Sequence, residues 1–547
     1  MSTTITFTGI AVNPVGYLAA TAESGQVTLY WSTPVSPQYS DSVIALRNPT
    51  SVPTETLTDF TSYGNGATVG SSTVIKVLDT DGASVVDGGL TNGLKYYYKI
   101  FNAYKDLYSE TSNLSIDSTP TPGTGGTPAW TYSLAGAGAS LGIPLTQGSR
   151  VIAARGNRLF ALDRATGAQD WITSPLGGSV EGWLVPWPKS GTYSDVLGDW
   201  TAYTLYAGAT DGKAYAFDTS GNQVWASGVL GDGIQATVSP QSWDLEFLNP
   251  DFQLTYTDGA GGPMDVVFVA TRNGSTTNNT VSALRGFAAS GGTPDGGTSI
   301  WTFDPQNLVP PAPMDIVVAA PQPTSAPHNL VIVGSYSAGQ TQPSLWAING
   351  VTGVNGPAGA LVASKGVLGN GPPAHLGDIT SEVTFGYACW DCWEVNTIYA
   401  GTASGYVVAL NLPDLTEKWA ANFDAGSPIV GYIWEDLYDP GTLYFTTQDG
   451  YVRAIRDNGA SATELWRTAT AIPSASSPVV DEDRGTLWVG GSGGRLVEID
   501  TASGAMTTAF PGEAAETLGD PTVDFVGGRV YVGSSAGRLH AVPIPLP

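Results

Sequence analysis

Short stretches in which apolar and polar residues alternate run along the whole chain, and glycine-rich turns separate them. Residues 26–31, Gln-Val-Thr-Leu-Tyr-Trp, alternate in this way. In a later stretch Tyr96, Tyr98 and Ile100 fall on one face, and the residues between them fall on the other. Strict alternation is typical of a half-buried β-strand. Because the chain has 547 residues and only 13% of them are charged, the pattern predicts an all-β protein with more than one core.

The N-terminal part of the chain combines a strand that ends in Trp31 with a tyrosine-rich strand that follows a turn at residues 91–93. This arrangement, with Ser-Glu-Thr-Ser-Asn after it, resembles a fibronectin type III domain over about residues 18–119. The resemblance implies a β-sandwich of a kind that acts as a spacer or an adhesive unit. We expect this domain at residues 1–118. A Thr/Pro/Gly linker is expected at 119–128, where too few apolar side chains are present to build a core.

A repeated phrase, consisting of a strand, a glycine turn and a second strand, fills the rest of the chain. Its equivalent positions are Ala161, Ala216, Ala283, Ala347, Ala409, Ala454, Glu498 and Ala541. The last four positions lie 45, 44 and 43 residues apart. Such a period is typical of the four-stranded blades of a β-propeller. The repeat therefore predicts an eight-bladed propeller over residues 129–547.

The eighth copy of the repeat ends at Pro547, before its outer strand. A strand of the right type, Ala129-Trp-Thr-Tyr-Ser-Leu, stands ahead of the first copy without a partner of its own. We expect residues near Trp130 to supply the missing strand and to close the ring, because closure pairs strand edges that would otherwise be open.

The stretch Ala161-Leu-Asp-Arg-Ala-Thr-Gly167, followed by Trp171, is similar to the repeat of pyrroloquinoline-quinone-like propellers. That family includes quinoprotein dehydrogenases and non-catalytic scaffold propellers such as the lipoprotein of the Bam outer-membrane assembly complex. The resemblance covers about residues 129–547 and implies the propeller fold, but it leaves the activity open.

The signatures of a quinoprotein enzyme are not evident in the sequence. The resemblance would lead one to expect an adjacent Cys-Cys pair and a calcium site of carboxylates and Asn, whereas the two cysteines are Cys389 and Cys392. Trp393 follows them, so the c-type haem motif is absent as well. A local disulfide and two free thiols in a loop between strands both fit this spacing.

Other catalytic motifs are equally sparse. His328, His375 and His540 are widely separated, which leaves little material for a zinc site or a His-dependent triad. Gly-x-Ser-x-Gly occurs around Ser492 and Ser535, but both serines occupy the same hairpin of successive repeats, and an elbow needs a strand-to-helix turn. We therefore predict no catalytic residue, no cofactor and no bound metal.

The charge balance limits the possible partners. Lys and Arg number 22 against 48 Asp and Glu, and the formal net charge of −26 repels phosphate backbones and anionic lipids. We expect no nucleic-acid partner. A run of about 18 apolar residues and a recognisable signal peptide are both missing from the chain as given, which predicts no membrane insertion.

Long insertions in the earlier blades mark the candidate binding surface, because loops commonly carry function. Several of them follow the first strand of a blade and should emerge on one face of the disc. The candidate binding residues are Trp187, Tyr193, Trp200, Trp243, Phe247, Phe252, Trp390 and Trp393. Aromatic side chains of this kind serve protein interfaces and sugar sites, but they also form small cores beneath long loops.

Taken together, these features favour a non-catalytic structural or binding protein that exposes a propeller face to protein neighbours in an assembly or to a surface glycan. Few charges with abundant Ser, Thr and Gly are typical of surface or virion proteins, so a phage tail or capsid component is the first expectation. A secreted or cell-surface adhesion or carbohydrate-binding protein is the alternative. A divergent quinoprotein or glycan-active enzyme would instead place carboxylates in the central channel.

Overall fold

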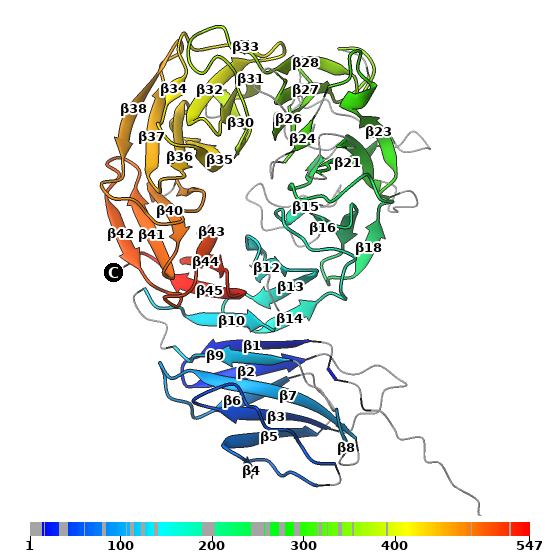
Figure 1. The fold of residues 1–547 in the computed structure, drawn as a ribbon, viewed down its shortest axis with the longest axis vertical. Helices are drawn as coiled ribbons and strands as arrows, with labels where there is room; N and C mark the ends of the chain where they lie inside the picture. Colours follow the sequence, from blue (N-terminus) through cyan, green and yellow to red (C-terminus); the bar gives the residue numbers. More distant parts are fainter. Residues whose placement is uncertain are drawn as a thin grey trace, which may run out of the picture.

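In the computed structural model, the chain forms a ring of β-sheets with a smaller two-sheet body packed against its rim (Figure 1). The structure describes residues 12–546 except 13, 16, 32–41, 60, 79–83, 105–106, 110–113, 122–125, 136–140, 189–202, 242–255, 258–262, 273–278, 289–295, 313, 317–319, 325–326, 337–341, 353–354, 390–391, 483 and 525–526. Within these residues the helical structure is one 3₁₀ turn, η1 (Pro305–Asn307). None of the described helical structure is long and apolar enough to cross a membrane. The predicted all-β class is confirmed.

The two-sheet body is a sandwich formed by the N-terminal strands. One sheet contains β1 (Leu18–Glu23), β2 (Gln26–Trp31) and β6 (Ser84–Gly88). The other contains β4 (Thr68–Val69), β5 (Ser72–Leu78), β3 (Ser42–Asn48), β7 (Tyr96–Tyr104) and β8 (Leu107–Tyr108), with β9 (Ser115–Ser118) paired to β7. The alternating residues Trp31, Tyr98 and Ile100 point inward and form the core between the sheets, as their two-residue period predicts.

Eight blades form the ring in the described part of the chain. Blades 1 and 2 contain β11 (Leu145–Gln147), β12 (Arg150–Arg155), β13 (Arg158–Asp163) and β14 (Gln169–Ile172), then β15 (Val185–Pro188), β16 (Tyr203–Gly208), β17 (Ala214–Phe217) and β18 (Gln223–Ala226). Blade 3 contains β19 (Ser239–Gln241), β21 (Pro263–Ala270), β22 (Val281–Ala288) and β23 (Ser299–Phe303), with β20 (Tyr256–Thr257) on β21. Blade 4 contains β24 (Asp315–Ile316), β25 (Gln322–Pro323), β26 (Leu330–Tyr336), β27 (Leu345–Asn349) and β28 (Leu361–Lys365).

The other four blades follow the same plan. Blade 5 contains β30 (Thr384–Cys389), β31 (Cys392–Gly401), β32 (Tyr406–Asn411), β33 (Thr416–Glu417) and β34 (Phe423–Asp424). Blade 6 contains β35 (Ile429–Glu435), β36 (Thr442–Thr447), β37 (Val452–Asp457) and β38 (Ala462–Arg467), with β29 (Ser381–Glu382) parallel to β35. Blades 7 and 8 contain β39 (Val479–Asp481), β40 (Thr486–Gly491), β41 (Arg495–Asp500) and β42 (Met506–Ala509), then β43 (Leu518–Asp524), β44 (Arg529–Ser534), β45 (Arg538–Pro543) and β10 (Trp130–Leu134).

The propeller core is divided among the spaces between blades. A cluster of buried apolar side chains fills each junction of neighbouring blades that the structure describes. No blade can bury both of its faces alone, so stability depends on every blade having a neighbour on each side. An open ring would leave two blade faces exposed to water.

A tryptophan in the outer strand also ties several blades to the next one. The indole N–H of Trp171 donates to the carbonyl of Thr219 at 3.1 Å, and that of Trp466 donates to Thr501 at 2.7 Å. Each acceptor lies just after the third strand of the following blade. The indole ring thus packs on the following blade, and its N–H group finds a hydrogen-bond acceptor in the same contact.

Strand β10 completes blade 8 and closes the ring as predicted. It runs antiparallel to β45, with Trp130 opposite Ala541 and Ser133 opposite Arg538. Trp130 makes the same contact as the other outer tryptophans, because its indole N–H donates to the carbonyl of Arg164 in blade 1 at 3.2 Å. Gly167 has a φ of +72°, and a Cβ there would lie 2.5 Å from the indole. The glycine is therefore needed for this close approach.

The opposite edge of β10 pairs with β1 of the sandwich. Ala19 lies opposite Leu134 and Ala22 lies opposite Thr131, so one seven-stranded sheet runs β43–β44–β45–β10–β1–β2–β6. The two bodies consequently share a core, in which Tyr17 and Ala19 pack with aromatic side chains of β10 and blade 1. Figure 1 shows β10 and β1 side by side at this junction.

A charged network lies beside the shared sheet. Arg538 of β45 pairs with Asp117 of the sandwich and with Glu513 and Glu516 of blade 8's approach loop, and Lys95 joins Asp117 at 3.1 Å. Burial would raise the pKa of Glu516, but its hydrogen bond with His540 and the charge of Arg538 outweigh burial and hold the pKa at about 2. His540 thus lies in a buried polar contact, with its Nε2 atom 3.2 Å from Oε2 of Glu516.

Replacing Trp130 tests whether the ring depends on this closure. We expect Trp130→Ala to lower the free energy of unfolding by about 3–5 kcal/mol, because it removes a buried indole that packs between blade 8 and blade 1 and donates to the carbonyl of Arg164. Phe510→Ala is the control, since that ring at the outer edge of blade 7 is 61% exposed and should cost little. Urea unfolding followed by circular dichroism measures both. Equal losses for the two variants would contradict the closure argument.

The shared sheet also predicts that the sandwich and the propeller move as one body. Spin labels at Val86→Cys on the sandwich and Leu465→Cys on blade 6, both exposed positions, should give a single narrow distance distribution by pulsed electron resonance. Cys389 and Cys392 are changed to Ser in this background. The control pair, Val224→Cys with Leu465→Cys, lies entirely within the propeller and sets the width of a rigid pair. A distribution much broader than the control would show a hinge.

Candidate functional site

The aromatic residues proposed from the sequence lie largely outside the described residues. Tyr193, Trp200, Trp243, Phe247, Phe252 and Trp390 belong to those segments, and only the backbone of Trp393 is described, in β31. Trp187 lies in β15, half-buried against the cluster between blades 2 and 3. Its buried indole N–H has no acceptor among the described residues. The aromatic binding surface therefore stays a prediction.

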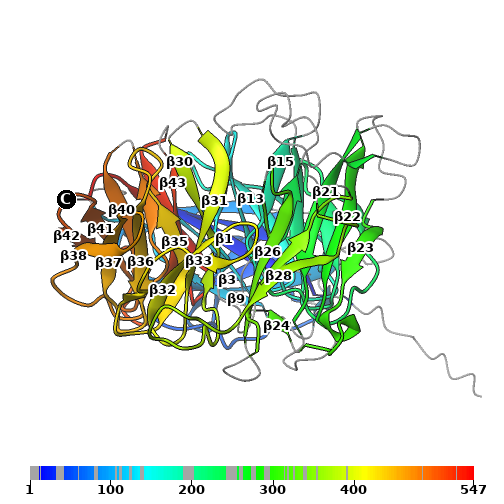
Figure 2. The ribbon, with the colours of Figure 1, turned by 90° about the horizontal axis from the view of Figure 1, so that it is seen from above.

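The strands that flank these insertions are described. They are the first and second strands of blade 2 (β15 and β16), blade 3 (β19 and β21) and blade 5 (β30 and β31). Figure 2 shows β15, β30 and β31 rising toward the same side of the ring. Cys389 and Cys392 are partners across the hairpin of β30 and β31, while their side chains lie outside the described structure.

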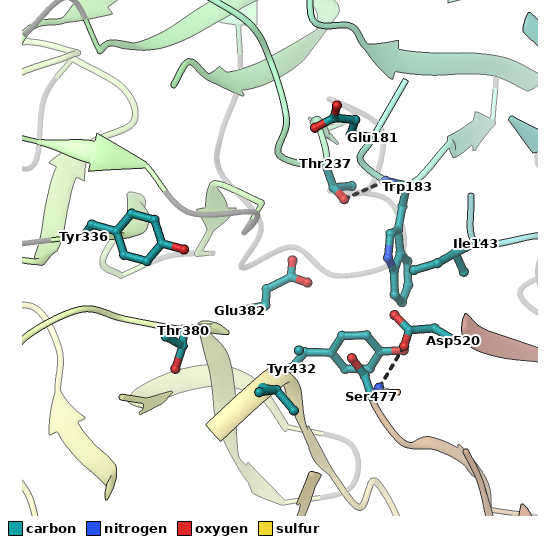
Figure 3. Close-up of a pocket in the computed structure, with 12 residues that line it drawn as sticks. Ile143, Glu181, Trp183, Thr237, Tyr336, Thr380, Glu382, Tyr432, Ser477 and Asp520 are labelled. Atoms are coloured by element: carbon teal, nitrogen blue, oxygen red, sulfur yellow. Dashed lines mark hydrogen bonds between the residues drawn. The ribbon is translucent and has the colours of Figure 1, made fainter. Parts of the chain in front are cut away.

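A second candidate site, the central channel, contains residues that sequence analysis did not single out. A cavity of about 460 Å³ lies there, walled by segments from around the ring. Its lining includes Ile143, Trp183, Thr237, Tyr336, Glu382, Tyr432, Ser477 and Asp520, and Glu382 comes from β29, the strand that pairs with β35 of blade 6. A neighbouring cavity of about 390 Å³ shares Trp183, Glu382 and Tyr432 with it. Figure 3 shows these side chains converging on the channel.

A bulge in β35 brings Tyr432 into the channel. The pairing of β35 with β36 steps from Val430 opposite Thr446 to Trp434 opposite Tyr444, so residues 431–433 stand opposite one residue. Gly431 permits this excursion with a φ of +73°, and a Cβ there would lie only 1.8 Å from the hydroxyl of Ser477. Bulges of this kind re-aim a side chain out of the regular alternation.

A similar bulge places Asp520. Gly519 and Asp520 of β43 stand opposite Gly533 alone, because the pairing steps from Leu518 opposite Ser534 to Pro521 opposite Val532. Asp520 accepts a hydrogen bond from the backbone N–H of Ser477 in the neighbouring blade at 2.8 Å. Its sequence signal is weak but present: Asp520 precedes Pro521 just as Ser477 precedes Pro478 one repeat earlier.

Two aromatic rings form one wall of the cavity. The rings of Trp183 and Tyr432 meet edge to face at 5.0 Å between centroids, although they come from blades 2 and 6. The backbone N–H of Trp183 donates to the hydroxyl of Thr237 at 2.9 Å, which holds the tryptophan segment against blade 3. Gly182 lets the two blades approach, since a Cβ there would lie 2.6 Å from the carbonyl oxygen of Ala236.

Burial governs the protonation of the channel carboxyls. It raises the pKa of Glu382 to about 7, although hydrogen bonds from Gln322 and from the backbone of Ala320 partly offset it. It also raises the pKa of Asp520 to about 6 against hydrogen bonds from Ser476 and Ser477. Two carboxyl groups thus titrate close to neutrality in one cavity.

The lining also bears on which groups the channel could hold. Glu181, Glu382 and Asp520 line the main cavity, and no Lys, Arg or His is among the described lining residues. Channel carboxylates are what the enzyme alternative requires, whereas a cation that would pair with a carboxylated quinone is not among the described lining residues. A group of three or more metal-ligating side chains does not occur among the residues that the structure describes.

The raised pKa of Glu382 predicts how stability depends on pH. The pKa of Glu382 is about 7 in the folded state, above the ordinary value of 4.5. The folded state is therefore fully stable below pH 4.5, where Glu382 is protonated, and it loses stability as the pH rises through 7 and the buried carboxyl becomes charged. We expect Glu382→Gln to be more stable than the unmodified chain by about 1–3 kcal/mol near pH 8, with no difference near pH 4.5. Urea unfolding at both pH values measures this. The control is Glu181→Gln, which changes an exposed acid of the same cavity and should leave the free energy of unfolding nearly unchanged at both pH values. A change of stability in Glu382→Gln that is the same at both pH values would contradict the argument.

Three solved structures are similar to a large part of this chain. BamB from Moraxella catarrhalis is 15% identical, covers 73% of this chain and 95% of its own, and has a TM-score of 0.47. The computationally designed Ika8 protein is 13% identical, with 75% and 98% covered and a TM-score of 0.47. Sqt1 from Chaetomium thermophilum is 13% identical, with 74% and 95% covered and a TM-score of 0.50. At these identities the likeness concerns the fold alone.

No curated protein matches the sequence. A family model described as the outer membrane protein assembly factor BamB does match, over residues 122–292 and 293–545. The two segments together span the propeller and leave most of the sandwich unmatched. Because they cover well over half of the chain, this protein belongs to the PQQ-like propeller family described by the assembly factor BamB.

Proposed function

We propose that the chain is a non-catalytic scaffold that binds protein neighbours through one face of its propeller. The observation that carries this proposal is the seven-stranded sheet that joins blade 8 to the sandwich. A spacer fused through main-chain hydrogen bonds holds the propeller at a constant distance and angle from whatever the sandwich contacts. Such geometry suits a protein that positions others.

Family membership supports the same reading. The family is described as an assembly factor for outer membrane proteins, which is a role in bringing proteins together. The face that we assign to binding is the side of the ring toward which β15 and the hairpin of β30 and β31 rise (Figure 2). Loops on a rigid ring are a common way to build an interaction surface.

The finer proposal is a structural component of a virion surface, in the tail or the capsid, exposed outside the host cell. Within it, the sandwich is a fibronectin type III domain that serves as the spacer. The strand order β1–β2–β6 on one sheet and β5–β3–β7–β9 on the other supports this domain type. The low content of charged residues, 13%, supports an exposed and abundant surface role.

A density map of the protein purified from its native source tests the proposal directly. We expect repeated protein neighbours against the face that carries the hairpin of β30 and β31. Trp390→Ala together with Trp393→Ala should reduce incorporation into that assembly several-fold, because large aromatic side chains carry much of the energy of an interface. Leu465→Ala, at an exposed position on the outer strand β38, should leave incorporation unchanged.

Three results would contradict this function. An isolated particle with density only in the central channel would favour the enzyme, and sugar density on the face would favour the carbohydrate-binding alternative. Equal incorporation of the double variant and the Leu465→Ala control would show that the hairpin is not the contact surface.

A further inference from the structure

The acids of the central channel have neutral partners only. Glu181 accepts a hydrogen bond from Gln235 at 2.7 Å, and Glu382 accepts one from Gln322 at 2.5 Å. Asp520 is bound by the backbone of Ser477. Among the described lining residues of both cavities, acids and tyrosines are the only titratable groups. Acidic groups therefore gather there without a counterion among the described lining residues.

Two charged groups at the edges of the cavities are described. The guanidinium of Arg272 lies over the ring of Tyr336, 4.9 Å from its centroid. Glu435, in the wall of the second cavity, accepts a hydrogen bond from the backbone of Gly441 at 2.9 Å and adds a further acid. No ion pair to Glu382 or Asp520 occurs among the described residues.

The hydroxyl of Tyr432 is an independent sign of a missing partner. The side chain lines both cavities and is 7% exposed, yet its hydroxyl has no hydrogen-bond partner in the described structure. Figure 3 shows this hydroxyl pointing toward Asp520. A buried hydroxyl without a partner is costly, so this hydroxyl is available to bond to a group that enters the cavity.

The aromatic wall indicates the kind of cation. Trp183 and Tyr432 meet at 5.0 Å, and Trp434 extends the wall at 6.2 Å from Tyr432. Aromatic faces attract ammonium and guanidinium groups and add apolar contact for their alkyl stems. Calcium would instead need about six or more oxygen ligands.

We propose that the central channel binds an organic ammonium or guanidinium group. Glu382 and Asp520 neutralise its charge, Tyr432 accepts a hydrogen bond from it, and Trp183 covers its apolar part. The group belongs either to a free amine or to a Lys or Arg side chain of a protein that enters the channel. This inference does not depend on the proposed scaffold function, which concerns the face of the ring.

Binding should be linked to proton release. Burial raises the pKa to about 7 at Glu382 and to about 6 at Asp520, whereas a bound cation would favour the charged carboxylates. Affinity should therefore increase as the pH rises through this range. Acidic conditions protonate both groups and remove the attraction.

Isothermal titration calorimetry of the full chain tests the proposal. The probes are n-butylammonium, n-butylguanidinium and a short peptide with one Lys and one Arg, each measured near pH 8 and near pH 5. We expect binding near pH 8, at least about ten-fold weaker binding near pH 5, and proton release that varies with the ionisation enthalpy of the buffer. The n-butyl probe without a charge, n-butanol, should not bind.

Variants identify the site. Glu382→Gln with Asp520→Asn should weaken binding about ten-fold or more, and Tyr432→Phe should weaken it several-fold without altering the proton release. Asp232→Asn, at an exposed acid outside the cavity, should bind like the unmodified chain. If the double variant does not fold, as judged by circular dichroism, Tyr432→Phe decides the test.

Each outcome is decisive. Binding of the small cations that is lost in the variants supports a free amine as the ligand. Binding of the peptide alone, lost in the same variants, supports a side chain from a protein partner. Absence of binding by every probe, or binding that the channel variants leave unchanged, overturns the proposal.

Discussion

The double pairing of β10 is the constraint on which the rest of the structure depends. One edge of this strand completes blade 8, and the other edge carries β1 of the sandwich. Each blade buries its faces only against its neighbours, so the whole ring relies on the contact between the last blade and the first. Because the sandwich is paired to the same strand, the forces that close the ring also orient the second body.

The closing strand copies a device that the blades already use. Trp130 donates its indole N–H to a carbonyl of the following blade and packs on Gly167, as Trp171 and Trp466 do on their neighbours. The beginning of the propeller sequence therefore supplies the piece that its end lacks. Although β10 is far from β45 in the sequence, it can serve as the outer strand of blade 8 because the ring brings the first and last blades together.

The channel is built by departures from the same regularity. Ideal inner strands would present alternating side chains, but bulges at Gly431 and Asp520 turn Tyr432 and a carboxyl group into the ring. Buried acids without a counterion reduce stability, so their presence in a protein with a well-packed core suggests a function for the cavity. The described lining is acidic and aromatic, and it contains no Lys, Arg or His.

The repeat made the fold readable from sequence because one alternating pattern recurs at a nearly constant period, and even the closing strand near Trp130 stood out as an orphan. The aromatic insertions could be named in the same way, but nothing local decides what they contact. Glu382 and Asp520 lie 138 positions apart and look ordinary in the sequence. Only the closed ring brings them into one cavity, because bulges and neighbouring blades set which side chains face the axis. The sequence alone determined the blades and their closure, whereas the tertiary structure decided the acidic channel and the sheet shared with the sandwich.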